Sequence, residues 1–279
     1  MVVYSQGDNA HAKIASEKAA VLATELGDKK LLALALSFEI FARTFVGDIL
    51  DTEEIAETAV DAARESGDQF TIGMTLAMDG QRSLLLDGDN AQAHQKIEEA
   101  MAILQKSRNK WGYTMTMMAV AMAAKIHGNY VEARQRFAAC DPLFREMGDK
   151  HRLNMIKSEI AHIDRYEGNY QKAKAAYKET ILEWKRIGHR AAVAHQLECF
   201  ASIAKIEERG QRAAHLFGAA EALRQKIDIP MTAMERVEYE GEIADLKAGM
   251  DEKVFSISWS EGREMMMEQA VELATSDKP

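Results

Sequence analysis

The sequence predicts an all-α protein, a right-handed superhelical solenoid of antiparallel helix hairpins with a helical cap at its C-terminal end. Three observations support this class. A glycine followed by a polar residue recurs about every twenty residues, only three prolines occur in 279 residues, and apolar residues recur at helical spacing between the glycines. Each interval therefore holds one amphipathic helix. Helices joined by such short turns must be antiparallel neighbours, which gives a hairpin period of about forty residues.

The glycines that punctuate the predicted helices are evenly spaced, with one gap. They are Gly7, Gly27, Gly47, Gly67, Gly88, Gly128, Gly148, Gly168, Gly188 and Gly210. Near residue 108 the glycine is missing, and we expect Asn109 to adopt the left-handed conformation that ends a helix. Pro142 falls inside the helix that opens at Gly128, where it removes a backbone donor and is expected to kink or split that helix.

Two segments of the array share one pattern. Residues 127–137 read HGNYVEARQRF and residues 167–177 read EGNYQKAKAAY. The pattern Gly-Asn-Tyr-x-x-Ala-x-x-x-aromatic resembles the second helix of a tetratricopeptide repeat. Its alanine permits close helix approach, and its aromatic residue, Phe137 or Tyr177, can fill the space between neighbouring hairpins. The small residues expected at helix crossings are Ala12, Ala93, Ala133 and Ala173 in second helices, and Ala121 and Ala161 in first helices.

From Arg212 onward the period fades, so we divide the chain into a repeat array, residues 1–209, and C-terminal capping helices continuous with it, residues 210–279. The capping segment resembles the carboxyl-terminal end of large bacterial multidomain signalling regulators. In these LuxR-type transcription regulators and adenylate or guanylate cyclases, an ATPase module precedes a long tetratricopeptide-like array. The matching residues are Leu216 to Arg224, Pro230, Glu235, Arg236, Tyr239, Phe255, Trp259, Gly262, Arg263 and the EQAVELA tail.

The resemblance implies that this chain is the regulatory arm of a larger protein. The segment MVVYSQ, which precedes Gly7, reads as the end of a helix, so we expect the array to begin inside a helix of a longer chain. The capping residues themselves read as core, because the last hairpin of a solenoid exposes an apolar face that must be covered. In particular, Phe255 and Trp259 lie four residues apart and form an aromatic stripe.

Composition argues against several classes of partner. The formal net charge of −9 would repel phosphate backbones and anionic lipid surfaces, so we expect no direct nucleic-acid or membrane binding. The segment MVVYSQGDNAHAK lacks the basic and apolar blocks expected of a signal peptide, and the most apolar helix-length stretch carries Glu39 and Arg43. Cys140 and Cys199 lack the Cys-x-x-Cys spacing or a flanking histidine pattern, and we expect both to be small buried residues in a reducing cytosol. A cytoplasmic protein is therefore predicted.

No motif for catalysis or a cofactor is present. The sequence lacks a phosphate-binding loop, a dinucleotide fingerprint, a zinc-protease motif and a nucleophile elbow. His189 and His195 are six residues apart, which places them on different faces of a helix and argues against a metal site. We expect a protein that is not an enzyme and that binds no cofactor or metal.

A ligand would be expected in the concave groove, which the first helix of each hairpin lines in repeats of this type. Counted back from each glycine, the groove face carries Met78, Arg82, Met115, Met118, Met122, Met155, Ser158, His162, Arg165 and Tyr166. Methionine suits a surface that accommodates apolar segments of variable shape, although a methionine stripe also fits buried packing. In the segment TMTMMAVAM, Met118 is predicted to be partly exposed and Ala121 to be in the hairpin core. Arg82, His162 and Arg165 could bind an acidic partner.

Two functions are favoured by the sequence, and an enzyme with a noncanonical site is a third option, ranked below them because repeat scaffolds present binding faces. The leading hypothesis is a non-catalytic interaction or sensor module that binds a protein or peptide segment, or a small effector, in its groove and communicates with other domains of the same parent chain. The alternative is a free-standing scaffold, adaptor or self-association module that senses no effector.

Overall fold

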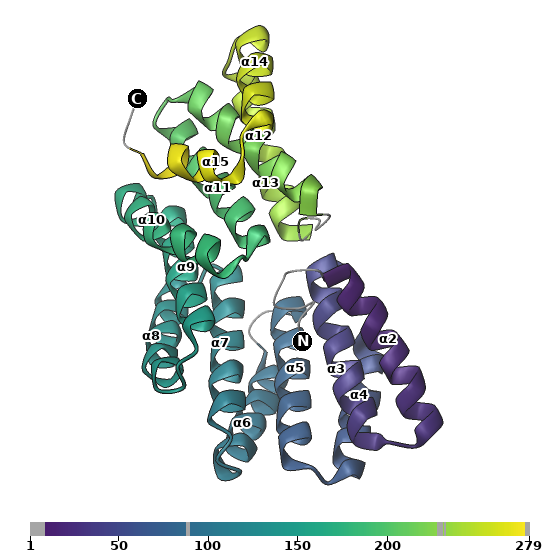
Figure 1. Ribbon diagram of the computed structural model, residues 1–279. Helices are drawn as coiled ribbons and strands as arrows, with labels where there is room; N and C mark the ends of the chain where they lie inside the picture. The colour runs from purple at the N-terminus through teal and green to yellow at the C-terminus, as the bar shows by residue number, and fades with distance from the viewer. Residues whose placement is uncertain (1–8, 88–89, 228–230, 232, 277–279) are drawn as a thin grey trace. The chain divides into compact units, whose positions relative to one another are not determined.

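Figure 1 shows the computed structural model, which describes residues 9–87, 90–227, 231 and 233–276. All fourteen elements within these residues are α-helices, so the predicted all-α class is confirmed. None of these helices is both long enough and apolar enough to cross a bilayer. The segment MVVYSQ, Pro230 and the side chain of Glu235, on which earlier predictions rest, lie outside the described part of the chain.

The chain divides into two compact units, and the division lies between Leu153 and Asn154. The sequence change at residue 210 does not coincide with it. The first unit contains α2 (Asn9–Leu26), α3 (Lys29–Val46), α4 (Glu53–Ser66), α5 (Gln69–Asp87), α6 (Ala91–Lys106), α7 (Lys110–Ile126) and α8 (Tyr130–Glu146). Each of these helices packs on the next in antiparallel fashion (Figure 1), and α5 also packs on both α3 and α7.

The second unit begins within α9 (Lys150–Tyr166). It continues with α10 (Tyr170–Ile187), α11 (Arg190–Ile206), α12 (Gly210–Ile227), α13 (Ala233–Ala248), α14 (Glu252–Glu264) and α15 (Met267–Thr275). Helices α10, α11 and α12 pack in sequence, α14 covers α12, and α15 contacts α10, α11 and α12. Helix α13 lies against α11 and α12. One hydrophobic core runs through these helices, from Ala161 to Ala274.

The turns use left-handed residues, as predicted, but not always at the expected position. The φ angles of Gly128, Gly168 and Gly188 are 76°, 79° and 77°. Where glycine is missing, Arg108 takes a φ of 57°, whereas Asn109 caps the following helix by accepting from Gly112 N at 2.8 Å. The expectation for Asn109 was therefore wrong by one residue, because its side chain is better used as an N-cap.

The small residues predicted at the helix crossings are buried. Ala93, Ala133 and Ala173 have no exposed surface, and neither do Phe137 and Tyr177. Ala121 and Ala161, on the partner helices, are also fully buried, whereas Ala12 is half-buried. Alanine therefore allows close approach of the helix pair, and the aromatic side chain one turn later fills the adjoining space.

Helix α8 is not split at Pro142, contrary to one of the two predicted outcomes. It runs through this proline to Glu146. Pro142 lies about one turn from the helix end, so it removes a single intrahelical hydrogen bond. Phe137, Cys140 and Phe144 are fully buried along one face, and their packing keeps the last turn in place.

The C-terminal helices meet at two glycines. A Cβ atom added to Gly218 of α12 would lie closer than 3.0 Å to the Trp259 carbonyl oxygen, and one added to Gly262 of α14 would overlap the His215 carbonyl oxygen. Backbone thus packs on backbone at this crossing. The predicted aromatic stripe is present beside it, with the rings of Phe255 and Trp259 5.2 Å apart.

We expect Gly218→Ala and Gly262→Ala each to lower the free energy of unfolding by about 2 kcal/mol or more, because the added methyl group must push two backbones apart. Gly241→Ala is the matched control. Gly241 also lies inside a helix, but open space surrounds it, so alanine should be neutral or stabilising by up to about 1 kcal/mol. Urea unfolding of the three variants tests this contrast, and equal effects at all three positions would contradict the close crossing.

Candidate functional site

The ten residues predicted to line a groove are largely inside the protein. Arg82, Met118, Ser158, His162 and Arg165 are buried, and only Tyr166 is well exposed. The remaining residues, Met78, Met115, Met122 and Met155, are half-buried. The residues up to Met122 belong to the first unit and those from Met155 onward to the second.

The predicted exposure of Met118 is wrong. Its side chain is 5% exposed, as deeply buried as that of Met117 at 9%. Helix α7 packs against α5, α6 and α8, so more than one of its faces is covered. Arg82 is also engaged internally. It pairs with Asp79 at 3.1 Å, and Asp79 is in turn bound by Lys96 at 2.6 Å.

Ser158 points into the helix packing rather than toward solvent. Its hydroxyl oxygen accepts hydrogen bonds from Trp184 Nε1 at 3.0 Å and from Gln196 Nε2 at 2.9 Å. The same Gln196 amide donates to Thr180 Oγ1 at 2.7 Å. A buried polar network therefore joins α9, α10 and α11 where an open groove face was expected.

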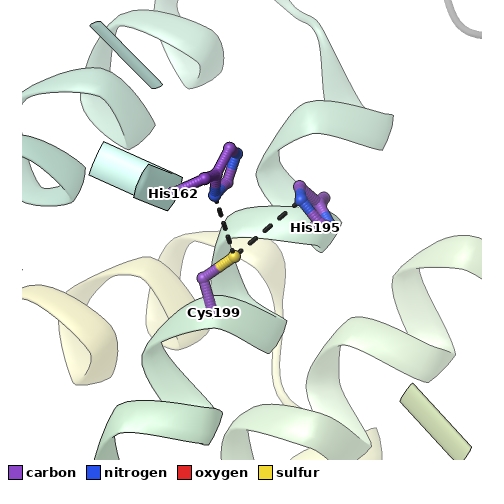
Figure 2. A group of neighbouring side chains, drawn as sticks. All are labelled: His162, His195 and Cys199. Carbon is purple, nitrogen blue, oxygen red and sulfur yellow. Dashed lines mark hydrogen bonds between the residues drawn. The ribbon is translucent and has the colours of Figure 1, made fainter. Parts of the chain in front are cut away.

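Three side chains with metal-binding chemistry converge one turn along this network. Figure 2 shows His162 of α9 and His195 of α11 pointing at the sulfur of Cys199, also of α11. His162 Nδ1 lies 3.7 Å from Cys199 Sγ, and His195 Nε2 lies 3.9 Å from it. One nitrogen from each histidine and the sulfur all lie within 4.8 Å of one another. This is the only such group among the described residues.

Tyr177 closes the cluster on the α10 side. Its hydroxyl oxygen is 2.6 Å from His162 Nδ1. Burial raises the pKa of the Tyr177 hydroxyl well above its usual value, and the neighbouring Cys199 adds to this effect. Tyr177 is therefore neutral at physiological pH and keeps its proton for hydrogen bonding.

A carboxylate orients His195 from the other side. His195 Nδ1 lies 3.3 Å from Glu198 Oε2, and since a carboxylate only accepts, the nitrogen must donate. Glu198 is itself held by Arg224 through two hydrogen bonds of 2.6 and 3.0 Å. The proton on Nδ1 leaves the lone pair of His195 on Nε2, the nitrogen that faces Cys199.

Arg165 links the cluster to α13. Its guanidinium pairs with Glu238 at 2.5 Å, and the Tyr166 hydroxyl donates to the same carboxylate at 3.1 Å. Burial alone would lower the pKa of Arg165, but Cys199, Tyr177 and Glu238 outweigh burial and raise it. Burial would raise the pKa of Glu238, but Arg165 outweighs burial and lowers it. Both groups are therefore ionised at neutral pH.

A small cavity of about 20 Å³ lies between α9, α11, α12 and α13, with room for about one water molecule. His195 and Cys199 line it on one side, and Glu238 and Tyr239 line it on the other. Within the described residues, the buried Tyr239 hydroxyl has no hydrogen-bond partner. A water-sized space lined by several charged and polar side chains suits a polar occupant.

Sequence reasoning missed this cluster, although part of the signal was present. His195 precedes Cys199 by four residues, a spacing that places both on one helical face, and the pairing of His195 with His189 was the wrong comparison. His162 was predicted as a groove residue, but its proximity to Cys199 depends on how α9 packs on α11. Cys199 is buried in the hydrophobic core as expected, at 2% exposure, but two histidine nitrogens also lie against its sulfur.

The donor set of two imidazoles and one thiol suits a metal ion of borderline softness. Scans of this chain against models of protein families and against curated proteins gave no match.

We expect Glu238→Gln to lower the free energy of unfolding by about 1 to 2 kcal/mol at pH 7, because it leaves the buried Arg165 charge without its counter-ion. The Glu238 side chain is 37% exposed, so solvent screening keeps the cost below that of a fully buried pair. Glu240→Gln, at an exposed position of the same helix, should change stability by less than about 0.5 kcal/mol.

The effect of Glu238→Gln should depend on pH. A carboxyl group whose pKa is lowered by folding stabilises the protein above its unfolded pKa, about 4.3, and the stabilisation is lost as pH falls through the folded value. Glu238 faces Arg165 and Tyr166 of α9 and His195 of α11. The difference between wild type and variant in urea unfolding should therefore be full at pH 7 and shrink below about pH 4. A constant difference would exclude the ion pair as its cause.

Proposed function

We propose that this chain is a non-catalytic helical-repeat interaction module of the cytoplasm that binds an acidic helical segment of a protein partner. The binding surface is the Arg165–Lys205 face, which we define as Arg165 and Tyr166 of α9 together with Lys205 of α11. In this proposal α13 is an internal ligand of the same chemistry, and a partner segment binds by displacing it.

The observation that carries the proposal is the way α13 contacts this face. Glu238 of α13 binds Arg165, and Lys205 binds Glu242 at 2.6 Å and Asp245 at 3.2 Å. These three carboxylates are spaced at i, i+4 and i+7, so they form one stripe along α13. The α9–α11 side is thus cationic toward a single acidic helical stripe.

An apolar stripe lies next to the acidic one. Tyr239, Ile243 and Leu246 of α13 pack against the hydrophobic core, and the Tyr239 ring lies edge-on to Phe217 at 5.7 Å. The ligand class is therefore an amphipathic helix with acidic and apolar residues one position apart. Many proteins recognise an amphipathic helix in this way, through side chains of the helix spaced at i, i+3, i+4 and i+7.

Helix α13 is lightly held compared with its neighbours. Among its described side chains only Leu246 is buried, whereas α12 has nine buried residues. Elements with few buried apolar contacts open at a low free-energy cost. A partner that offers the same stripes can therefore compete with α13 without unfolding the core.

The repeat register and the C-terminal resemblance support the wider assignment. Helices α3, α5, α7, α9 and α11 begin at Lys29, Gln69, Lys110, Lys150 and Arg190, steps close to forty residues. This period exceeds the length of a standard tetratricopeptide repeat, about 34 residues, so we propose a right-handed solenoid of longer, degenerate hairpins of that type. The resemblance to the ends of multidomain bacterial regulators favours a regulatory arm, in which displacement of α13 reports partner binding to the rest of the parent chain.

The test uses the whole chain and a labelled peptide of the α13 sequence, AMERVEYEGEIADLKA. The double variant Glu238→Lys/Glu242→Lys places positive charge against Arg165 and Lys205, which should expel its own α13. Fluorescence anisotropy should show that this variant binds the peptide at least ten-fold more tightly than wild type, because the tethered helix competes at an effective concentration of about a millimolar.

The control double variant Glu240→Lys/Glu272→Lys changes the net charge equally at exposed positions and should behave like wild type. A peptide in which Glu238, Glu242 and Asp245 are replaced by amides should bind the charge-reversed chain weakly. Equal binding of both peptides, or no gain from charge reversal, would refute an acidic helix as the ligand.

A further inference from the structure

We propose that His162, His195 and Cys199 bind one Zn²⁺ ion, which joins α9 to α11. This inference does not depend on the proposed partner binding, because none of the three ligands belongs to the Arg165–Lys205 face. The site is defined by three donor atoms, His162 Nδ1, His195 Nε2 and Cys199 Sγ.

The distances between donor atoms are close to those of a zinc site. Zinc binds imidazole nitrogen at about 2.0 Å and thiolate sulfur at about 2.3 Å, so the nitrogen and sulfur of a tetrahedral site lie about 3.6 Å apart. The two nitrogen–sulfur distances here are 3.7 and 3.9 Å. The two nitrogens lie within 4.8 Å of each other, and rotation of the histidine side chains must bring them to the separation of about 3.3 Å that a tetrahedral ion requires.

The helices hold these donors in advance. His195 and Cys199 are at i and i+4 on α11, so the helix itself fixes their separation. His162 is 5% exposed and Cys199 is 2% exposed, and both lie within packed helices. Ligands on rigid, buried elements lose little freedom when a metal binds.

The surroundings supply the outer contacts that zinc ligands require. Glu198 accepts from His195 Nδ1, and Arg224 fixes the carboxylate. A carboxylate–histidine–metal arrangement of this kind sets the tautomer and increases the basicity of the bound nitrogen. The cluster thus has a second layer of contacts that simple packing of a histidine and a cysteine does not need.

Tyr177 shares His162 Nδ1 with the proposed ion. Its hydroxyl oxygen lies 2.6 Å from that nitrogen. For zinc to take the nitrogen lone pair at about 2.0 Å, the Tyr177 side chain must first shift away from Nδ1, and its hydroxyl can then turn toward the sulfur. Tyr177 then donates to the thiolate, which stabilises the charged ligand.

A neighbouring cavity can supply a water molecule as the fourth ligand of a tetrahedral site. The cavity of about 20 Å³ is bordered by His195 and Cys199 and has room for about one water molecule. Tyr239 also borders this cavity, together with Glu198 and Glu238. Three protein ligands plus one water form a common zinc arrangement. A hard cation such as Mg²⁺ prefers oxygen ligands and should not bind here.

The experiment measures metal binding by the whole chain after removal of metal with a chelator. Zn²⁺ competed against a chromogenic chelator should bind at one ion per chain, and Mg²⁺ should not bind. Co²⁺ should produce an absorption band from thiolate-to-cobalt charge transfer, which requires a cysteine ligand. Cys199→Ser and His195→Gln should each abolish the Co²⁺ band or weaken Zn²⁺ binding by at least about ten-fold.

The chain offers matched controls. Cys140→Ser changes the other buried cysteine, which lies in the first unit, and His215→Gln changes a histidine of α12 outside the cluster. Both variants should keep the Co²⁺ band and the Zn²⁺ affinity of wild type. Should Cys199→Ser fail to fold, the band in Cys140→Ser alone assigns the thiolate to Cys199. Absence of the band in wild type, its loss in Cys140→Ser, or unchanged binding in folded Cys199→Ser would overturn the site.

Discussion

Close helix crossings are the constraint on which the other features depend. Alanine at positions such as Ala133 and Ala173 lets second helices approach their partners until these positions have no exposed surface. When two helices approach so closely, the side chains next to the alanine are buried between them, whether they are apolar or polar. Phe137 is buried there as a purely apolar ring, whereas Tyr177, forty residues later, buries a hydroxyl group in the equivalent position. That hydroxyl, together with Ser158 and His162, must find partners inside the protein, and the buried network among α9, α10 and α11 follows from this requirement.

The all-α class and the packing of consecutive helices could be predicted from the sequence because they depend on local signals. Glycine spacing, helical periodicity and the alanine positions each act within a few residues, and they located the helices and their crossings. The candidate site depended on contacts between distant segments. The left-handed residue was predicted one position too late, at Asn109, because the N-cap role of the Asn109 side chain was not considered. Met118 is buried because helices pack on several faces of α7 at once. His195 and Cys199 carried a local signal in their spacing of four residues, whereas the addition of His162 required the packed structure.

Arg165 was predicted as a residue that could bind an acidic partner, and in the structure helix α13 lies against it. The acidic group that the structure supplies is Glu238, from the same chain. A face that looks open in the sequence of one helix can be covered by a segment seventy residues further along, and no periodicity within α9 indicates this. The arrangement also places ionic contacts and the His162–Cys199 cluster on either side of one small cavity, since Glu238 and Cys199 both line it. A change of charge on α13 therefore alters the electrostatic potential near the Cys199 sulfur.

The distribution of cysteines has a consequence for following the protein in solution. The chain has two cysteines, and each compact unit contains one, Cys140 in the first and Cys199 in the second. Burial raises the pKa of the Cys140 thiol to about 12, so at neutral pH the reactive thiolate is almost absent while the unit is closed. Reaction of Cys140 with a thiol reagent therefore measures how often the first unit opens. The natural sequence thus carries one chemical reporter in each half of the chain, and unfolding of the halves can be timed separately without introducing a label.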